Sequence, residues 1–275
     1  KPLSADEVKP LPWIGVNTPR LREQVANYYN CLERLDHGVG LLMAELRNSG
    51  QSENTIVIYI GDHGAQFPRG KGTVYEGGLR VPMIIRWPAI AKAGQSCHEL
   101  VSTVDLLPTA LQAAGVEAPE ILPGRALQPL LSEPKVTEWR QYIFGFTTGA
   151  NARNCFVQHS VRDERYKLIS SPRAGTVNLI AGSYLDESHQ NFVISGATSK
   201  DQATASRTVR AAFTRWKRPP RFELYDLQKD PYEWHDQSQN PELVEVKKRL
   251  IKALTDQQER TYDPFIDSKN VEAYV

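Results

Sequence analysis

The segment Thr55–Ile60 is a continuous run of β-branched and aromatic residues in which apolar and polar side chains do not alternate. Such a run is typical of a strand covered on both faces, as in a parallel sheet. Before it, apolar residues from Val25 to Leu46 recur at alternating steps of three and four, the pattern of a long amphipathic helix. This stripe stops after about three heptads, which favours packing against a sheet over a coiled coil. A helix followed by a buried strand predicts an α/β fold.

The limits of this helix are marked by local signals. Thr18 and Pro19 supply an N-cap and a proline at the first helical position, and Ser49-Gly50 supplies a stop. Three further segments of the first half carry similar signals: a strand in Val81–Trp87, a helix from Ser102 or Thr103 to Gly115, and a proline-rich connector from Pro119 to Pro134.

After about residue 138 the pattern changes to short strands separated by turn residues, which predicts an antiparallel sheet. The expected strands are Tyr142–Thr147, Cys155–Arg162, Tyr166–Ser170 and Phe222–Asp226. The later half of the polar stretch Ala174–Pro220 and the tail Pro241–Tyr262 are expected to be helical. We therefore expect two parts, an α/β part in residues 1–137 and a smaller α+β subdomain in residues 138–275.

Charge and composition exclude several classes of protein. Lys plus Arg number 33 and Asp plus Glu 32, so the net charge is 33 − 32 = +1, and no global charge directs the chain to nucleic acid or to an anionic membrane. The most apolar run, Val81–Ala91, is interrupted by Arg86 and two prolines, so we expect no transmembrane helix. Three cysteines without close spacing argue against a disulfide framework and against a structural zinc site. One pair can still bridge in an oxidising compartment. No signal peptide is visible at the start of the chain.

The sharpest local feature is Gly61-Asp-His-Gly64, directly after the buried strand. Ligands in open α/β sheets collect at the carboxyl ends of strands. Flanking glycines allow an abrupt turn, so the side chains of Asp62 and His63 can converge on a cation with oxygen and nitrogen ligands. The alternative is an Asx-turn followed by an ordinary surface histidine.

A glycine-rich segment follows, Gly70-Lys-Gly-Thr-Val-Tyr-Glu-Gly-Gly-Leu-Arg-Val-Pro82. Lys71 lies between two glycines and can present a compact positive charge to a tetrahedral oxyanion, while Arg80 can hold a carboxylate such as Glu76. The signature of a nucleotide phosphate-binding loop is absent. A purely structural turn is the alternative.

These motifs, in this order, resemble the carboxyl half of the sulfatase family in the alkaline phosphatase superfamily. The resemblance rests on Leu35-Asp36, Val39-Gly40, Asn54-Thr-Ile-Val57, Gly61-Asp-His-Gly64, the run Lys71–Pro82, Trp87-Pro88, Thr103-Val-Asp-Leu-Leu-Pro-Thr109 and Glu223-Leu-Tyr-Asp-Leu-Gln-Lys-Asp-Pro231. The second half looks most like the sulfamidase-like, glycan-directed branch. The fold implied is part of a sulfatase-type α/β sandwich with a smaller carboxyl-terminal α+β subdomain that contains an antiparallel sheet.

The resemblance implies a metal-dependent hydrolase of sulfate esters or sulfamates that uses a formylglycine made from Cys or Ser. Asp62 matches a metal-ligand aspartate. His63 matches the neighbouring position, beside the metal and the bridging oxygen of the substrate. Lys71 matches a lysine that contacts the sulfate and helps the leaving oxygen depart. Calcium is the metal implied, with manganese or zinc as alternatives because imidazole is a softer ligand than an amide oxygen.

This sequence departs from the family pattern in one large respect. The nucleophile signature, Cys or Ser followed by x-Pro-x-x-Arg, is missing, and so is the amino-terminal pair of metal-ligand aspartates. We therefore expect the formylglycine in a missing amino-terminal half, and we expect this chain alone to be inactive. The alternatives are a phosphodiesterase or phosphonate hydrolase of the same superfamily and a noncatalytic binding or assembly module. The resemblance implies a periplasmic, secreted or lysosome-like location.

Further features bear on a sulfated carbohydrate substrate. Between Gln202 and Phe222 there are six basic residues and no acidic one, namely Arg207, Arg210, Arg215, Lys217, Arg218 and Arg221. Such a basic ridge can attract a polyanionic glycan, and a solvated helix face is the alternative. His159 and Arg162, on an expected strand, are weaker candidates for substrate contacts.

Overall fold

The computed structural model describes residues 1–132, 136, 138–149, 155–185 and 195–274. The chain forms two compact units. The larger unit consists of Lys1–Gly40, Gly61–Val81 and Phe144–Val275, and the smaller unit consists of Leu41–Ile60 and Pro82–Ile143. The expected division of the family domains at residues 137 and 138 stays a prediction.

Helix α1 (Pro19–Asn48) has the expected limits, and Gly50 follows it in the left-handed conformation (φ +74°). Its first turns bury Leu21, Val25 and Ala26 in the core of the larger unit. The later part of the apolar stripe is exposed, as at Leu42, which is 72% exposed. The expectation that the whole stripe packs against a sheet is therefore wrong for the second half of the helix. Apolar periodicity identifies a face but does not supply the segment that covers it.

The smaller unit contains a two-stranded sheet of β1 (Val57–Ile60) and β2 (Met83–Arg86). Both strands were expected, but they pair antiparallel, in a register that joins Val57 to Arg86 and Ile60 to Met83. The expected parallel sheet is wrong for this strand in the described part of the chain. A run of apolar residues without alternation indicates two apolar faces, and it carries no information on the direction of the neighbouring strand.

The expected helix after Ser102 is present as a 3₁₀ turn and α3 (Leu106–Ala113). Ser102 and Asp105 form a capping box at its start. Asp105 is fully buried, and its carboxylate also accepts a hydrogen bond from the backbone of Arg125 and pairs with Arg140. A short helix, α4 (Gln128–Ser132), lies within the expected connector.

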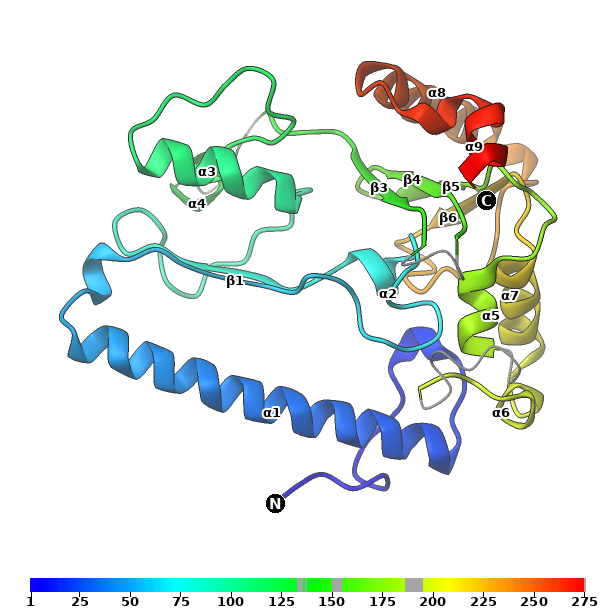
Figure 1. The fold of residues 1–275 in the computed structure, drawn as a ribbon, viewed down its shortest axis with the longest axis horizontal. Helices are drawn as coiled ribbons and strands as arrows, with labels where there is room; N and C mark the ends of the chain where they lie inside the picture. Colours follow the sequence, from blue (N-terminus) through cyan, green and yellow to red (C-terminus); the bar gives the residue numbers. More distant parts are fainter. Residues whose placement is uncertain (133–135, 137, 150–154, 186–194, 275) are drawn as a thin grey trace. The chain divides into compact units, whose positions relative to one another are not determined.

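The larger unit contains the expected antiparallel sheet, with strand order β3-β4-β5-β6 (Figure 1). Strand β5 pairs antiparallel with both β4 and β6. The strands are β3 (Ile143–Thr147), β4 (Gln158–Arg162), β5 (Tyr166–Ser170) and β6 (Phe222–Asp226). The other helices of this unit are α2 (Glu76–Leu79), α5 (Leu179–Leu185), α6 (Ser199–Ala203), α7 (Arg207–Lys217), α8 (Val244–Arg260) and α9 (Ser268–Tyr274). Of these, α2, α5 and α9 were not expected from the sequence.

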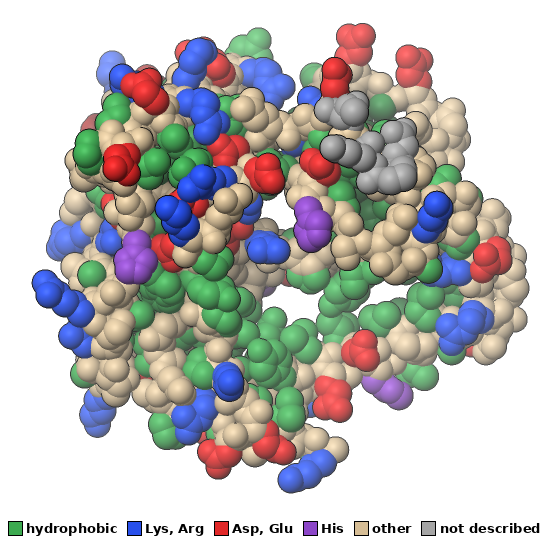
Figure 2. Space-filling model, turned by 180° about the vertical axis from the view of Figure 1, so that it is seen from behind, with side chains coloured by type: hydrophobic (Ala, Val, Ile, Leu, Met, Phe, Trp, Pro, Cys, Tyr) green, Lys and Arg blue, Asp and Glu red, His purple; other side chains and the backbone are tan. Residues whose placement is uncertain are grey.

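Helix α7, which lies in the basic segment, has one face buried in the core. Val209, Ala212, Phe213 and Trp216 are buried at helical spacing, so the helix packs into the core of the larger unit. Arg215 projects inward and pairs with the buried Glu223. The basic residues of this segment therefore do not form one continuous ridge. Figure 2 likewise shows Lys and Arg side chains interspersed with Asp and Glu over the visible face.

Within the described ranges, no helix combines the length and the apolar character needed to cross a membrane.

Asp201 joins α6 to the start of α1. Its carboxylate accepts hydrogen bonds from the Thr18 hydroxyl at 2.7 Å and from Thr198, and it pairs with Arg20. Burial acts to raise the pKa of Asp201, but the hydrogen bonds from Thr18, Arg20 and Thr198 outweigh burial and hold the pKa below its ordinary value.

The substitution Asp201→Asn is expected to lower the free energy of unfolding by about 1–2 kcal/mol at pH 7, because it weakens a helix cap and an ion pair. A lowered folded-state pKa stabilises the fold above the unfolded-state pKa, and this contribution is lost as the pH falls through the folded-state value. Urea unfolding of both proteins should therefore show a difference that shrinks below the ordinary pKa of aspartate, 3.8. A difference that stays constant from pH 7 to acid would show that the carboxylate charge is not involved.

Candidate functional site

The loop between β1 and α2 is held by contacts of main chain on main chain. The backbone N–H of Gly64 donates to the Gly78 carbonyl at 2.9 Å, and a Cβ at residue 64 would lie 1.8 Å from the Gly77 oxygen. A Cβ at Gly70 would lie 2.1 Å from the Ala65 oxygen. Only glycine fits at such approaches, so these positions fix the path of the loop.

Lys71 is placed by this backbone. Its N–H donates to the Ala65 carbonyl at 2.9 Å, and its own carbonyl accepts a hydrogen bond from the Tyr184 hydroxyl at 3.1 Å. The loop therefore folds back so that the backbone of Lys71 lies against Ala65, two residues after His63. The Lys71 side chain is half-buried, and its ammonium has no hydrogen-bond or ion-pair partner in the part of the chain that the structure describes. It is a charge available to an anion.

Asp62 and His63 lie in a turn in which their side chains face each other. The Asp62 side chain is 85% exposed and that of His63 is 39% exposed. His63 Nε2 lies 3.2 Å from Asp62 Oδ2, while His63 Nδ1 lies 2.9 Å from the Gly64 carbonyl oxygen. The backbone N–H of His63 donates to Asp62 Oδ1 at 3.0 Å, so the Asx-turn considered as the alternative is also present.

The nitrogen and oxygen atoms that face each other in this turn are suitable ligands for a cation. Because Nδ1 faces a carbonyl oxygen, it carries a proton, and a neutral ring then turns an unprotonated Nε2 toward a carboxylate oxygen. A cation bound at this turn would satisfy both atoms. The described residues contain no group of three or more His, Cys, Asp or Glu side chains that could hold a metal. Asp62 and His63 could therefore supply only part of the shell of a metal such as Ca²⁺, which takes about 6–8 oxygen ligands.

Calcium binding by this chain is accordingly expected to be weak, with a dissociation constant on the order of 10⁻³ M, and to require Asp62. Asp62→Asn removes the ligand charge and should weaken binding by about tenfold or more, measured by calorimetric titration. Asp256→Asn on the exposed side of α8 is the matched control and should leave binding unchanged. Tight binding that survives Asp62→Asn would place the metal elsewhere.

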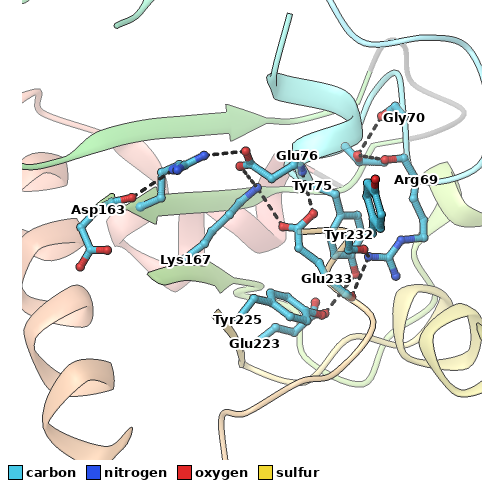
Figure 3. A network of polar contacts seen from close by, with 12 residues as sticks. Arg69, Gly70, Tyr75, Glu76, Asp163, Lys167, Glu223, Tyr225, Tyr232 and Glu233 are labelled. Carbon is cyan, nitrogen blue, oxygen red and sulfur yellow. Dashed lines mark hydrogen bonds and ion pairs between the residues drawn. The ribbon is translucent and has the colours of Figure 1, made fainter. Parts of the chain in front are cut away.

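A buried charge network attaches the short helix α2 to the sheet. Glu76 lies 3.0 Å from Lys167 Nζ and 2.6 Å from Arg162 Nη1. Lys167 Nζ also lies 3.0 Å from Glu233, and the side chains of Lys167 and Glu233 are each 1% exposed. Figure 3 shows Lys167 extending from β5 between the two carboxylates. Glu233 also accepts the backbone N–H of Glu76 at 2.7 Å, so α2 is held by its main chain as well as by its side chain.

The pKa values of the two carboxyl groups of this network are shifted in opposite directions. Burial acts to raise the pKa of Glu76, but Lys167 and Arg162 outweigh burial and hold that pKa below its ordinary value. Burial raises the pKa of Glu233 above its ordinary value despite the nearby Lys167. Arg80 was expected to hold Glu76, but among the described residues the Glu76 carboxylate forms its ion pairs with Lys167 and Arg162 of the sheet. Arg80 lies exposed at the end of α2, and its charge makes only a smaller contribution to the lowered Glu76 pKa.

Arg69, two residues before Lys71, anchors the other end of the loop. It is fully buried, and its Nη2 donates to the carbonyls of Tyr232 at 3.0 Å and Glu233 at 2.8 Å. Its guanidinium carbon lies 4.1 Å from the ring centre of Tyr75 and 4.5 Å from that of Trp234. Cation–π contacts on the two rings offset the desolvation of this charge.

Tyr75 continues the network to the sheet. Its hydroxyl donates to Glu223 Oε2 at 3.0 Å, an oxygen that also accepts from the Tyr225 hydroxyl and from Arg215 Nε at 3.2 Å. Burial raises the pKa of Tyr75 well above its ordinary value, so the phenol remains a donor. The loop that carries Lys71 is therefore fastened at Arg69, Tyr75 and Glu76.

One feature of the sequence points to this network. Lys167 and Glu223 lie inside expected strands, and a charged residue that is buried in a strand needs a partner. The partners of these two residues could not be assigned from sequence spacing. Lys167 pairs with Glu76 and Glu233, which lie far from it in the sequence, and Glu223 pairs with Arg215 of the preceding helix.

The two weaker candidates lie on β4 but on different faces of the sheet. Arg162 is engaged with Glu76, so a substrate contact has to compete with that ion pair. His159 lies 2.7 Å from Asp263 and is almost fully buried. The structure thus brings Asp62, His63 and Lys71 onto one loop and leaves His159 apart from them.

Comparison with known proteins gives consistent matches. Residues 5–116 match the family model Sulfatase, and residues 61–179 match the family model described as N-sulphoglucosamine sulphohydrolase, C-terminal. An ulvan-active sulfatase of Formosa agariphila is 33% identical over 231 residues, which cover 83% of this chain and 42% of that protein. N-sulphoglucosamine sulphohydrolase of Homo sapiens is 28% identical over 273 residues, which cover 93% of this chain and 52% of that protein. The solved structure of a protein in complex with its substrate D-glucosamine-2-N,6-O-disulfate is similar with a TM-score of 0.64 and 24% identity, covering 88% of this chain and 42% of that one.

The chain has the mixed α/β, alkaline phosphatase-like fold. Within that class, the chain belongs to the sulfatase family. Both the fold class and the family expected from the sequence are confirmed. The chain spans about half the length of the curated relatives it matches, 42% of the Formosa agariphila protein and 52% of the human one.

Proposed function

We propose that the complete protein hydrolyses sulfate esters or sulfamates of a sulfated sugar, and that this chain supplies the loop that binds the sulfate group. The observation that carries the proposal is the unpartnered ammonium of Lys71 in the described chain, on a braced loop that also carries Asp62 and His63. A compact cation suits a tetrahedral oxyanion. The similarity to an ulvan-active sulfatase and to an N-sulphoglucosamine sulphohydrolase supports a sulfated sugar as the substrate class.

In this proposal each residue of the loop has a distinct role. Lys71 binds a sulfate oxygen, and its ammonium stabilises the negative charge that develops on the leaving oxygen or nitrogen, to which it can donate a proton. Asp62 and His63 would hold a metal ion, which would polarise the sulfate oxygens. Glu76, Arg69 and Tyr75 act indirectly, since their buried contacts keep the loop in place. Sulfatases in general use a formylglycine as nucleophile, and we propose that it lies in a part of the protein outside this sequence.

The test is a comparison of the complete protein with the 275-residue chain. Sulfate release is measured with D-glucosamine-2-N,6-O-disulfate, N-sulfoglucosamine and an aryl sulfate, and release of the alcohol is measured with a phosphonate monoester. The complete protein is expected to release sulfate from a sulfated sugar, and the 275-residue chain is expected to show no turnover, because covalent catalysis needs its activated nucleophile.

Other results would change the assignment. Preference of the complete protein for the phosphonate monoester would favour the phosphonate hydrolase alternative. Absence of turnover on every substrate, with retained binding of sulfated sugar, would favour a noncatalytic module. Turnover of an aryl sulfate by the 275-residue chain that persists through further purification would mean that this chain contains its own nucleophile.

We also propose a periplasmic, secreted or lysosome-like location for the complete protein, on the basis of its family resemblance. Localisation of the tagged complete protein by cell fractionation tests this.

A further inference from the structure

A pocket of about 370 Å³ lies between strands β3 and β4 and the carboxyl-terminal end of the chain. It is formed by β3, His159 of β4, the last turns of α8 and the segment around Asp263. All of the residues that line the pocket belong to the larger unit. None of Asp62, His63 and Lys71 lines it.

The pocket is on the sheet face opposite the Lys71 loop. Successive side chains of a strand point to opposite faces. Arg162 and the neighbouring Lys167 reach Glu76 on one face, and His159, three positions before Arg162, is on the other. Helix α8 packs against β4 and β5, and Figure 1 shows α8 and α9 on one side of this sheet and α2 on the other. The pocket is therefore a separate feature from the proposed sulfate site.

Aromatic rings form much of its wall. The ring centre of Phe146 lies 5.8 Å from that of Phe265 and 4.7 Å from that of His159. Leu254 adds an apolar side chain from α8. Phe146 is 49% exposed although it lies beside this cavity. Walls of this kind favour a flat apolar molecule over a strongly hydrated one.

His159 adds one directed polar group. Burial lowers the pKa of His159 below its ordinary value although Asp263 acts to raise it, so the ring is neutral near pH 7. Nε2 lies 2.7 Å from Asp263 Oδ2 and therefore carries the ring proton and donates it to that carboxylate. Nδ1 is then an acceptor, and it has no hydrogen-bond partner among the residues that the structure describes. A buried acceptor without a partner costs free energy that a donor from a ligand would recover.

The charges around the pocket limit the ligand further. Asp263 is the only ionised side chain among its lining residues, so the pocket repels anions and offers no cation to hold them. Its carboxylate is already occupied, by His159 and by the Gln258 amide at 3.1 Å. A positively charged ligand would find both Asp263 oxygens already hydrogen-bonded, Oδ2 to His159 and Gln258 and Oδ1 to the backbone N–H of Phe265.

We propose that this pocket binds an uncharged aromatic molecule of one or two rings that stacks on Phe146 and Phe265 and donates one hydrogen bond to His159 Nδ1. The Phe146 ring lies against the imidazole of His159. Because the Phe146 side chain is half-exposed, it can turn aside and let the donor of the ligand reach Nδ1. The site is independent of the proposed sulfatase activity, and it can be tested on this chain without turnover.

Three probes of matched shape separate the contributions, each titrated into the 275-residue chain and followed by ligand-observed NMR. Indole has an aromatic body and one donor, 1-methylindole lacks the donor, and indole-5-carboxylate has the donor and a negative charge. Indole is expected to bind about tenfold more tightly than 1-methylindole, because the latter leaves Nδ1 unpaired. Indole-5-carboxylate is expected not to bind, because Asp263 repels it.

Two variants test the assignment of the residues. His159→Phe removes the acceptor and keeps an aromatic ring, so it should abolish the preference for indole over 1-methylindole. Thr261→Trp fills the pocket from an exposed position at the end of α8 and should abolish binding of both. Thr204→Trp, at the matched exposed C-cap of α6, should leave binding unchanged. Thermal unfolding establishes that each variant is folded.

The proposal is overturned if indole fails to bind at millimolar concentration, if indole and 1-methylindole bind equally to the unmodified chain, or if binding survives Thr261→Trp. If His159→Phe does not fold, the ligand series and Thr261→Trp still decide. Binding of the carboxylate as tight as that of indole would likewise contradict the assigned orientation toward Asp263.

Discussion

Replacing Lys71 with alanine in the complete enzyme is expected to lower kcat by about 10²–10³-fold, the usual loss when one preorganised electrostatic contact to developing charge is removed. The ammonium has no partner in the described chain, so its full charge is available to the reacting group. Since charge on the leaving atom is larger in the transition state than in the bound substrate, the loss falls on the chemical step. Steady-state kinetics on a sulfated sugar measure it.

Two comparison variants give this result its meaning. Lys71→Arg should recover only part of the rate, because the planar guanidinium needs more room than an ammonium. Lys248→Ala removes an exposed lysine on α8 and should leave kcat unchanged. An increase in KM with unchanged kcat in Lys71→Ala would mean that Lys71 binds substrate and transition state equally, which contradicts the proposed role.

Replacing Lys167 with methionine is expected to lower the free energy of unfolding of this chain by about 3–5 kcal/mol, because it leaves two buried carboxylates without their shared cation. Glu76 would keep Arg162, but Glu233 has its ion pair with Lys167 and is 1% exposed. Methionine has similar length, so lost packing contributes little. Urea unfolding measures the change.

The same experiment contains its own controls. Lys252→Met removes a lysine that is 75% exposed and pairs with Asp256, and it should change stability by about 0.5 kcal/mol or less. Adding Glu233→Gln to Lys167→Met should recover part of the loss, because it removes one uncompensated charge. If Lys167→Met is as stable as the original chain, the network does not brace the loop and the account of the site given above fails.

Elements whose signals are local were predicted well from the sequence. The limits of α1 follow from Thr18, Pro19 and Gly50, and strands β5 and β6 have the expected residues. Capping residues, prolines and turns act on neighbours in the chain, so their effect does not depend on the rest of the fold. Helices α2, α5 and α9 were missed because they span only four, seven and seven residues, too few to show a clear period.

Pairings between distant segments could not be predicted in the same way. The direction of β2 relative to β1 and the partners of Glu76 depend on which segments meet in three dimensions. The candidate residues Asp62, His63 and Lys71 could be grouped from the sequence because one glycine-rich loop carries all three. The proximity of His159 to Asp263 had no counterpart in the sequence pattern.

The main-chain contacts of the loop divide its residues into two kinds with different tolerance to change. At Gly64 and Gly70 any side chain collides with backbone, so mutation there alters the path of the loop. At positions 62, 63 and 71 this limit does not apply: the Lys71 ammonium has no partner in the described chain, and the side chains of Asp62 and His63 each make a single hydrogen bond to the main chain of the turn. The loop can therefore exchange its chemistry while keeping its shape. A library randomised at these three positions should yield mostly folded proteins, among which altered metal or anion preference can be selected.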